Sequence, residues 1–336
     1  MNFIDAWVAT NAKQKLVRQQ LELGTLGDEE VEVQVENCGL CHSDLSMLSN
    51  EWGWSQFPAV LGHEAIGTVV AVGRSAKGLH VGQKVGVGWT SESCMHCRQC
   101  LSGDHHLCAT SIPTIVGHFG GFASRVRSHW AWAVPIPDRL DASDAGPLLC
   151  GGITVFSPLA MYARPTSRVG IVGIGGLGHI AVKFAAAYGC EITAFTSTES
   201  KFAEARQFGA HHVVSSKDSS AIKKLSGTLD LILVTVNASL DWESLIAALA
   251  PHGRLHVVGA VLDAMPIAAL SLITGQKSVS GSPTGSPVGL ATMLDFAARH
   301  QITPQTEHYP MSQINEAMER LEAGKARYRI VLDADF

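Results

Sequence analysis

The chain has 336 residues, of which 46% are hydrophobic, so it is long enough for about two domains and can bury a sizeable core. Thirty acidic residues against 25 basic ones give a net charge of −5 at pH 7, and no Lys/Arg-rich run is present, so we expect no nucleic-acid or membrane partner. The first ten residues lack the basic start and apolar stretch of a secretory signal. No apolar run approaches the roughly 18 residues of a membrane span, and we therefore expect a cytoplasmic protein.

Residues 1–135 carry short β-branched runs broken by glycine, a pattern that predicts an irregular, strand-rich domain. The clearest runs are Val31–Val35, Ala65–Val72 and Lys84–Val87. From about Gly151 the pattern changes to strands that alternate with helices, which favours a parallel, doubly wound sheet. The alternating segments are Arg168–Val172, Gly176–Tyr188, Glu191–Phe195, Ser200–Phe208, His212–Ser215, Leu229–Val234, Trp242–Leu249 and Arg254–Val258.

Domain boundaries follow from this change of pattern. We place the doubly wound domain at residues 148–283, because the Gly/Ser/Pro-rich stretch Ser280–Gly289 follows its last strands. The simplest architecture returns the tail, residues 284–336, to the strand-rich domain of residues 1–147. The predicted class is therefore α/β, with a second domain built from both ends of the chain.

Half of the eight cysteines fall within one window of 15 residues, at Cys94, Cys97, Cys100 and Cys108. Two-residue gaps let a tight loop turn successive thiolates toward one point, and Zn²⁺ accepts four sulfurs in a tetrahedron. Because a closed site has no vacant position for substrate, this zinc would be structural and would fold a lobe at about residues 90–110. The rival interpretations are an iron–sulfur cluster, for which nothing nearby supplies redox chemistry, and two disulfides, which are typical of secreted chains.

A glycine-rich turn follows the apolar strand Val169–Val172 and opens an apolar helix. It contains Gly173, Gly175, Gly176 and Gly178, with Leu177 before the last. Residues without Cβ permit a tight turn and the close approach of a pyrophosphate, and the helix N-terminus offers free N–H groups to it. Strand, turn and helix together predict a dinucleotide site, whereas the alternative is an ordinary strand-to-helix turn.

The end of the next strand indicates which dinucleotide is bound. An acidic residue there would hold the ribose diol and repel a 2′-phosphate. This chain instead has Thr196, Ser197 and Thr198, followed by Lys201, so hydroxyls and an ammonium group predict NADP(H). Glu199 lies close and is a complication, and in the alternative interpretation the hydroxyls cap the following helix while Lys201 is solvated.

A second metal site is predicted from Cys41 and His63 in the first domain and Cys150 where the domains would meet. Sulfur and imidazole are ligands that Zn²⁺ favours, and three protein ligands leave a fourth position for water or substrate, as in catalytic zinc sites. Taken singly, each of these residues is more often a packing residue.

In this order the motifs resemble the zinc-dependent medium-chain dehydrogenases/reductases, and among them the cinnamyl-alcohol-dehydrogenase-like enzymes, especially the bacterial NADPH-dependent broad-specificity aldehyde reductases. The resemblance covers almost the whole chain and rests on Cys38–Asp44, Gly62–Glu64, the four-cysteine lobe, Gly151–Val155, the glycine turn and Lys325–Arg329. It implies a Rossmann-type domain that binds NADP(H), a GroES-like catalytic domain, two zinc ions per chain and a homodimer.

The resemblance also implies roles for the ligand residues. Cys41, His63 and Cys150 would hold the catalytic zinc, with Glu64 as an occasional fourth ligand that helps to exchange water and substrate. Asp44 would lie behind His63 and fix the tautomer of its imidazole.

Further roles concern the proton and the cofactor. Ser43 would hydrogen-bond the substrate oxygen and relay its proton. In many alcohol dehydrogenases a histidine three residues further on passes that proton to solvent, but Ser46 stands there, so water, Ser46 and His42 remain candidates. His42 and Arg329 are also expected near the cofactor pyrophosphate. The nicotinamide is expected near Thr154, Val236 and Val258.

The implied reaction is reversible hydride transfer between NADP(H) and a small aldehyde or primary alcohol. Trp52, Trp54 and Trp89 lie near the metal-ligand segments in sequence and are candidate walls of an apolar substrate pocket, or else core residues. Three other functions stay open: a narrow-substrate cinnamyl-type alcohol dehydrogenase, a zinc-free quinone or enone reductase, and a non-catalytic NADP(H)-binding redox sensor.

Overall fold

The computed structural model describes residues 3–336 and divides the chain into two compact units. Unit 1 comprises Met1–Ile153 and Thr284–Phe336, and unit 2 comprises Thr154–Pro283. Among residues 3–336, no single helix is long and apolar enough to cross a membrane. One pair of helices, Ala142–Leu149 and Gly151–Tyr162, passes the same criteria together but is bent by 61°.

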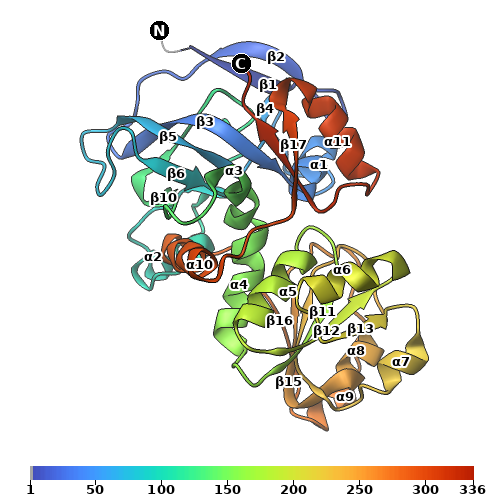
Figure 1. The fold of residues 1–336 in the computed structure, drawn as a ribbon. Coiled ribbons are helices and arrows are strands. Elements are labelled where there is room, and N and C mark those ends of the chain that lie inside the picture. The colour runs from blue at the N-terminus through green and yellow to red at the C-terminus, as the bar shows by residue number, and fades with distance from the viewer. Residues whose placement is uncertain (1–2) are drawn as a thin grey trace. The chain divides into compact units, whose positions relative to one another are not determined.

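The main sheet of unit 1 pairs strands of the first 135 residues with strands of the C-terminal segment (Figure 1). Its strand order is β10 (Ala133–Pro135), β6 (Lys84–Val87), β5 (Ala65–Val72), β3 (Glu30–Leu40), β18 (Arg329–Asp333) and β17 (Thr306–Pro310), with β9 (Arg125–His129) also paired to β3. Strand β18 runs antiparallel to β3, with Ile330 opposite Leu40. This register brings Arg329, from the C-terminal segment, next to the end of β3 that leads into Cys41.

Alternation along the strands explains the core of unit 1. In β3 the side chains of Val31, Val33 and Val35 are buried, whereas those of Gln34 and Glu36 between and after them are exposed. β-Branched residues favour such a pleated, half-buried surface. They pack in one cluster with Phe122 from the segment before β9.

The remaining elements of unit 1 are short. Two small sheets consist of β2 (Val17–Glu22), β1 (Phe3–Ala9) and β4 (Ala59–Val60), and of β7 (Thr90–Glu92) with β8 (Ile112–Pro113). The helices are α1 (His42–Ser49), α2 (Arg98–Leu101), α3 (Ala142–Ala145), α10 (Pro287–His300) and α11 (Ile314–Glu322), and α4 (Gly151–Tyr162) continues into unit 2.

Unit 2 is built on one fully parallel sheet (Figure 1). Its order is β13 (His212–Ser215), β12 (Glu191–Thr196), β11 (Arg168–Val172), β14 (Leu229–Val234), β15 (Leu249–Val257) and β16 (Ser278–Gly281). In chain order this is 3-2-1-4-5-6, the Rossmann arrangement, whose order reverses between β11 and β14. The predicted doubly wound sheet is confirmed.

The helices of unit 2 alternate with these strands. They are α5 (Gly178–Ala187), α6 (Phe202–Gln207), α7 (Ser219–Lys223), α8 (Trp242–Ala248) and α9 (Ala269–Ile273). Helix α5 begins two residues later than the sequence predicts, because residues 175–177 belong to the glycine turn. β15 begins five residues earlier than expected, at Leu249, and reaches its regular pairing with β14 through a register shift.

A histidine joins three elements of unit 1. His308 of β17 contacts Asp144 of α3 through Nε2 at 3.1 Å and Asp333 of β18 through Nδ1 at 3.0 Å. Partial burial lowers the pKa of His308, but hydrogen bonds and the charges of the two carboxylates outweigh that effect and raise it above its ordinary value. The imidazolium form is therefore favoured by folding.

We predict that this network stabilises the protein most in mild acid. A raised pKa in the folded state gives a contribution that is complete below the unfolded pKa and is lost as pH rises through the folded pKa. His308→Gln should therefore lower the free energy of unfolding by up to about 1 kcal/mol near pH 5.5 and by less near pH 8.5. Urea unfolding of both proteins at the two pH values measures this, and an equal loss at both contradicts it.

Candidate functional site

Four buried residues of unit 1 converge on one point. Cys41 caps the N-terminus of α1 directly after β3, His63 and Glu64 lie just before β5, and Cys150 follows the 3₁₀ turn Gly146–Leu149. One ligand atom from each lies within 4.8 Å of the others. Three sequence segments, up to 109 residues apart, thus supply one cluster.

The geometry of this cluster fits a metal ion. Cys41 Sγ lies 3.9 Å from Cys150 Sγ, and His63 Nε2 lies 3.3 Å from Cys150 Sγ. Two sulfurs and one imidazole nitrogen facing one another are a donor set that Zn²⁺ accepts with a fourth position open. The Cys150 thiol hydrogen-bonds the Cys41 sulfur and lowers the pKa of Cys41 well below its usual range, so the thiolate that a metal needs is favoured there.

Asp44 holds the cluster together from behind. Its carboxylate accepts hydrogen bonds from the backbone N–H of Cys41 at 3.0 Å and of Gly62 at 2.9 Å, and lies 3.1 Å from His63 Nδ1. With Nδ1 beside the Asp44 carboxylate, Nε2 is the nitrogen that faces Cys150 and could bind a metal. The role expected for Asp44 therefore has a geometric basis.

Glu64 pairs with Arg329, a contact that sequence reasoning missed. The carboxylate and the guanidinium form an ion pair in which both side chains are almost fully buried. Burial raises the pKa of Glu64 to about 7, although Arg329 opposes the rise. Glu64 Oε2 is buried with no partner, which leaves it available as the occasional fourth ligand, and Arg329 Nη1 also lies 3.9 Å from Cys41 Sγ.

Gly39 makes room for this pair. A Cβ at that position would overlap the carboxylate of Glu64. Local sequence gives no sign of the pairing, because Glu64 and Arg329 are 265 residues apart and meet only through the β3–β18 register. We expected Arg329 near the cofactor pyrophosphate, and within unit 1 its partner is Glu64.

Ser43 and a group of tryptophans lie at the edge of the cluster. The Ser43 hydroxyl is 3.8 Å from Cys41 Sγ. The ring of Trp89 stands edge-on to that of His63 at a centroid distance of 5.0 Å, and the rings of Trp52 and Trp54 each lie 6.1 Å from that of Trp89. Trp54 is 43% exposed, so this aromatic group extends from the cluster to the surface.

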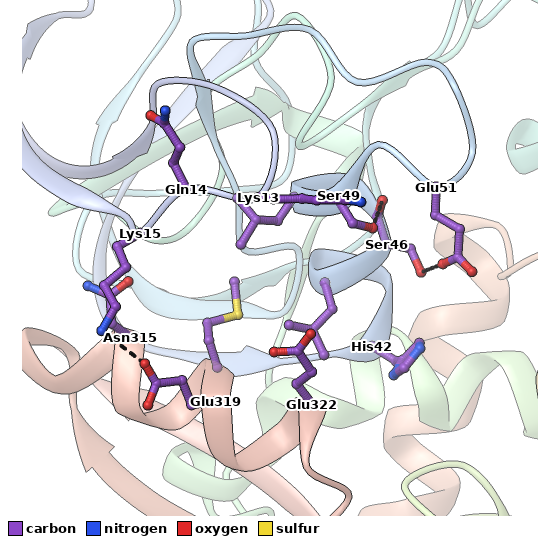
Figure 2. Close-up of a pocket in the computed structure, with 13 residues that line it drawn as sticks. Lys13, Gln14, Lys15, His42, Ser46, Ser49, Glu51, Asn315, Glu319 and Glu322 are labelled. Carbon is purple, nitrogen blue, oxygen red and sulfur yellow. Dashed lines mark hydrogen bonds and ion pairs between the residues drawn. The ribbon is translucent and has the colours of Figure 1, made fainter.

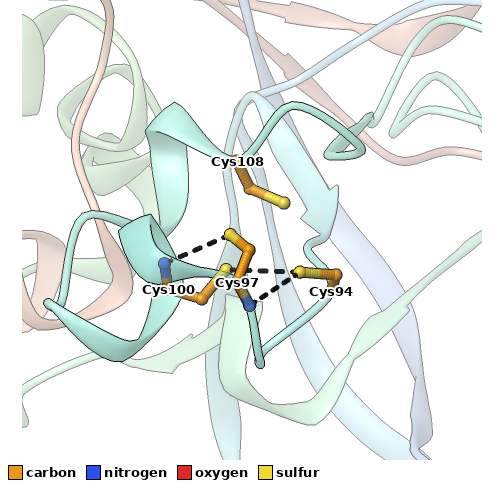
Figure 3. Close-up of side chains that lie close together, drawn as sticks. All are labelled: Cys94, Cys97, Cys100 and Cys108. Atoms are coloured by element: carbon orange, nitrogen blue, oxygen red, sulfur yellow. Dashed lines mark hydrogen bonds between the residues drawn. The ribbon is translucent and has the colours of Figure 1, made fainter.

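The four-cysteine lobe forms a second cluster, also within 4.8 Å (Figure 3). Cys94 Sγ lies 3.9 Å from Cys100 Sγ, and the backbone N–H groups of Cys97 and Cys100 donate to Cys94 Sγ and Cys97 Sγ. Burial opposes ionisation of Cys108, but hydrogen bonds from Thr110 and others lower its pKa to about 6. All the cysteines are free, so the disulfide interpretation finds no support.

In unit 2 the glycine turn connects β11 to α5 at the point where the strand order reverses. Gly173 has φ +93°, and a Cβ there would overlap the side chain of Val236, just after β14. A Cβ on Gly178 would overlap the carbonyl of Gly173, whereas Gly175 faces open space. The turn is therefore as tight as a pyrophosphate site requires, and ligands bind at such a switch point in open α/β sheets.

Comparison with known proteins agrees with this geometry. The family profile described as Alcohol dehydrogenase GroES-like domain matches residues 27–138, and that described as Zinc-binding dehydrogenase matches residues 176–299. The aldehyde reductase AdhA of Synechocystis is 52% identical over 330 residues, which are 98% of each chain. The chain belongs to the zinc-binding alcohol dehydrogenase family.

Solved structures of the family place the whole chain in the same fold. A cinnamyl alcohol dehydrogenase from Sorghum bicolor superposes with a TM-score of 0.95 at 38% identity, over 99% of this chain and 98% of its own. CAD from Helicobacter pylori, complexed with NADP(H), gives 0.89 at 28% identity over 98% of both chains. The predicted resemblance and fold class are therefore confirmed.

The end of β12 is rich in hydroxyls. Thr196 is buried and its Oγ1 accepts a hydrogen bond from the backbone N–H of Thr198 at 3.3 Å, whereas the side chains of Ser197 and Thr198 are exposed. Lys201 Nζ donates to the carbonyl of Ile174 in the glycine turn at 2.9 Å. The ammonium group is thus held at the glycine turn, close in sequence to the hydroxyls where the cofactor's ribose is expected.

The other residues expected near the nicotinamide also lie in unit 2. Thr154 is buried near the start of α4, and Val236 follows β14. The backbone N–H of Val258 donates to the carbonyl of Val234 at 3.0 Å, so Val258 lies at the carboxyl end of β15, next to the end of β14 that leads to Val236. Their roles stay predictions.

A groove of about 540 Å³ opens between the loop after β1, α1 and α11 in unit 1 (Figure 2). It is lined by Lys13, Gln14, Lys15, His42, Leu45, Ser46, Leu48, Ser49, Glu51, Asn315, Met318, Glu319 and Glu322. Inside it the Ser46 hydroxyl donates to Glu51 Oε2 at 2.6 Å. His42 and Ser46, both candidates for proton exit, therefore face one groove.

We predict that the lobe holds one metal ion by itself. Cys97→Ser removes one of four thiolate ligands, so purified protein should contain about one zinc ion per chain in place of two, and the lobe should be cleaved faster by trypsin at Arg98, because the metal's binding energy is folding energy for so short a segment. Cys190→Ser, at a buried cysteine outside both clusters, is the matched control. Elemental analysis measures the zinc content per chain, and an unchanged content in Cys97→Ser would overturn the assignment.

Proposed function

We propose that the protein is a zinc-dependent oxidoreductase that transfers hydride between NADP(H) and aldehydes or primary alcohols. The observation that carries this function is the buried cluster of Cys41, His63 and Cys150, a donor set of two thiolates and one imidazole with Ser43 at its edge. The Synechocystis relative named aldehyde reductase supports the substrate class. A zinc-free reductase has no use for such a cluster.

The chain's own residues prepare the reaction. When bound, the zinc ion supplies Lewis acidity at the substrate oxygen and the nicotinamide supplies or accepts the hydride. Asp44 orients His63 so that Nε2 faces the cluster, and Arg329 compensates the charge of Glu64, with which it is almost fully buried. Ser43 donates its hydroxyl proton to the substrate oxygen as negative charge grows there during aldehyde reduction.

The preference for NADP(H) rests on the end of β12. Its last residue, Thr196, and the following Ser197 and Thr198 carry hydroxyls where a carboxylate would select the ribose diol of NAD. Lys201 adds a positive charge beside the same turn. The NADP(H) complex of the 28% identical Helicobacter pylori protein supports this choice.

The tryptophans suggest which aldehydes enter. Trp89 contacts the ring of His63 and Trp54 extends the aromatic surface outward, so we propose that both line the substrate pocket. Such walls offer apolar area and ring faces to aliphatic and aromatic aldehydes alike. This favours a broad substrate range over a narrow cinnamyl type.

Domain roles and assembly complete the proposal. Residues 1–147 with 284–336 form the GroES-like catalytic domain and residues 148–283 bind the cofactor. In unit 2 the edge strand β16 presents open hydrogen-bonding groups, and Leu270 and Ile273 of α9 are 68% and 69% exposed. Unpaired edges and exposed apolar residues favour association, so we propose a homodimer through this surface. A cytoplasmic location stays a prediction.

The proposed function is tested by oxidation of NADPH and NADH with butanal and with benzaldehyde, on protein of known zinc content. We expect turnover of both aldehydes with NADPH well above NADH. Cys41→Ser should abolish it, because one thiolate ligand is lost from the cluster. Zinc-replete protein that binds NADPH but reduces neither aldehyde would favour a narrow substrate or a redox sensor.

We predict that Lys201 contributes to cofactor choice. A hydrogen bond to a charged group contributes about 1.5–3 kcal/mol, so Lys201→Ala should raise the KM for NADPH roughly 10- to 150-fold and leave the KM for NADH nearly unchanged. Lys224→Ala, a lysine elsewhere in unit 2, is the control for charge. An unchanged KM for NADPH in Lys201→Ala would remove the residue from the cofactor site.

A further inference from the structure

The Ser46–Glu51 pair connects a buried position to solvent. The Ser46 side chain is 3% exposed, whereas Glu51 is exposed and lies in the groove (Figure 2). The hydroxyl donates to Glu51 Oε2 at 2.6 Å, and the Glu51 backbone N–H donates to the Ser46 carbonyl at 2.9 Å. Two hydrogen bonds thus fix the carboxylate against the end of α1, with its acceptor directed at a buried hydroxyl.

Helix geometry places Ser46 in line with Ser43. The two residues are three positions apart in α1, so they share one face of the helix with Cβ atoms about 5–6 Å apart. One water between the two hydroxyls would bridge that gap. Ser43 lies 3.8 Å from Cys41 Sγ, so the face runs from the metal cluster to Ser46.

His42 shares the groove face with Ser46, because the two residues are four positions apart in α1 and line the same groove. It is adjacent to Ser43 in sequence, and adjacent helix residues do not face each other. Of the candidates for proton exit, Ser46 is the one whose hydroxyl donates to a carboxylate in the groove.

We propose that Ser46 and Glu51 carry the reaction proton between Ser43 and the solvent in the groove. The inference rests on the proposed function. Both residues act through Ser43 and touch no substrate. This chain thus replaces the histidine usual at the position of Ser46 with a hydroxyl that works together with a carboxylate five residues later.

The proton balance closes without another reactant. In alcohol oxidation the alcohol gives its proton to Ser43 and its hydride to NADP⁺. Ser43 passes its own proton to Ser46 through the bridging water, Ser46 passes one to the Glu51 carboxylate, and Glu51 releases it to water in the groove. Each hydroxyl loses one proton and gains one, so no charge stays in the buried segment, and aldehyde reduction runs the same steps in reverse.

Five other charged or titratable side chains line the same groove as Glu51. They are Lys13 and Lys15 from the loop after β1, His42 from α1, and Glu319 and Glu322 from α11. Lys15 Nζ forms an ion pair with Glu319 Oε1 at 2.9 Å (Figure 2). Glu322 faces the same groove without a bond to Ser46, so Glu322→Gln is a matched control for the loss of one carboxylate.

The test measures alcohol oxidation by the zinc-loaded enzyme from about pH 6 to pH 9. Glu51→Gln keeps an acceptor for Ser46 but takes up no proton, so its kcat should fall at least about tenfold near pH 7, while KM changes less than about twofold. Its rate should then rise with pH and with the concentration of a bulky buffer base such as triethanolamine, unlike that of the wild type or Glu322→Gln. Ser46→His added to Glu51→Gln should restore most of the rate.

The outcomes separate the two proposals. A Glu51→Gln enzyme with wild-type kcat and no dependence on buffer overturns the proton route and leaves the aldehyde reductase function intact. A wild-type enzyme that is inactive in both directions overturns both. If Glu51→Gln does not fold, the route requires a slow Ser46→Ala and an active Glu51→Asp, and the opposite pair of results overturns it.

Discussion

The buried carboxylate of Asp44 is the contact on which the catalytic cluster depends. It receives the N–H groups of Cys41 and Gly62 and lies against His63 Nδ1, so one side chain joins the start of α1 to the loop before β5. An unpaired buried carboxylate is strongly unfavourable, and three partners compensate its desolvation. The same interactions that stabilise the charge therefore also set the orientation of two metal ligands.

Two buried carboxylates near the cluster each lie against a nitrogen-bearing side chain. Glu64 and Arg329 form a second buried pair beside Asp44 and His63, and Arg329 also reaches Cys41 Sγ. Thiolates and carboxylates repel one another, so a fixed guanidinium makes it possible to collect several anionic groups before a metal ion adds its own charge. The register of β18 against β3 brings the Arg329 guanidinium to the cluster. The return of the C-terminal segment to the first domain therefore serves the site.

The parts of the site that sequence predicts are those with local patterns. The glycine turn and the four-cysteine lobe can each be recognised within about 15 residues of sequence, because their chemistry requires particular residues at fixed spacing. Cys41, His63 and Cys150 were predicted as a metal site from their ligand types, although each alone is more often a packing residue, and the family resemblance supplied their roles. The pairs Glu64–Arg329 and Ser46–Glu51 escaped prediction for another reason: they consist of common residues whose meaning depends on a strand register and on the end of a helix. Trp89 lies between these cases, because its place beside His63 follows only from the fold.

The two metal clusters differ in burial as their tasks differ. Cys94 and Cys97 are partly exposed on a lobe with little core of its own, so there the metal stabilises the fold and needs no access for substrate. Cys41, His63, Glu64 and Cys150 are all buried within a unit that already has a large core, so the scaffold exists without the metal and the ion can serve chemistry. Burial creates one further requirement at the cluster of Cys41, His63 and Cys150: a proton released there needs a path to water. The segment that runs from Cys41 through α1 to the exposed carboxylate of Glu51, two residues after the helix ends, offers such a path.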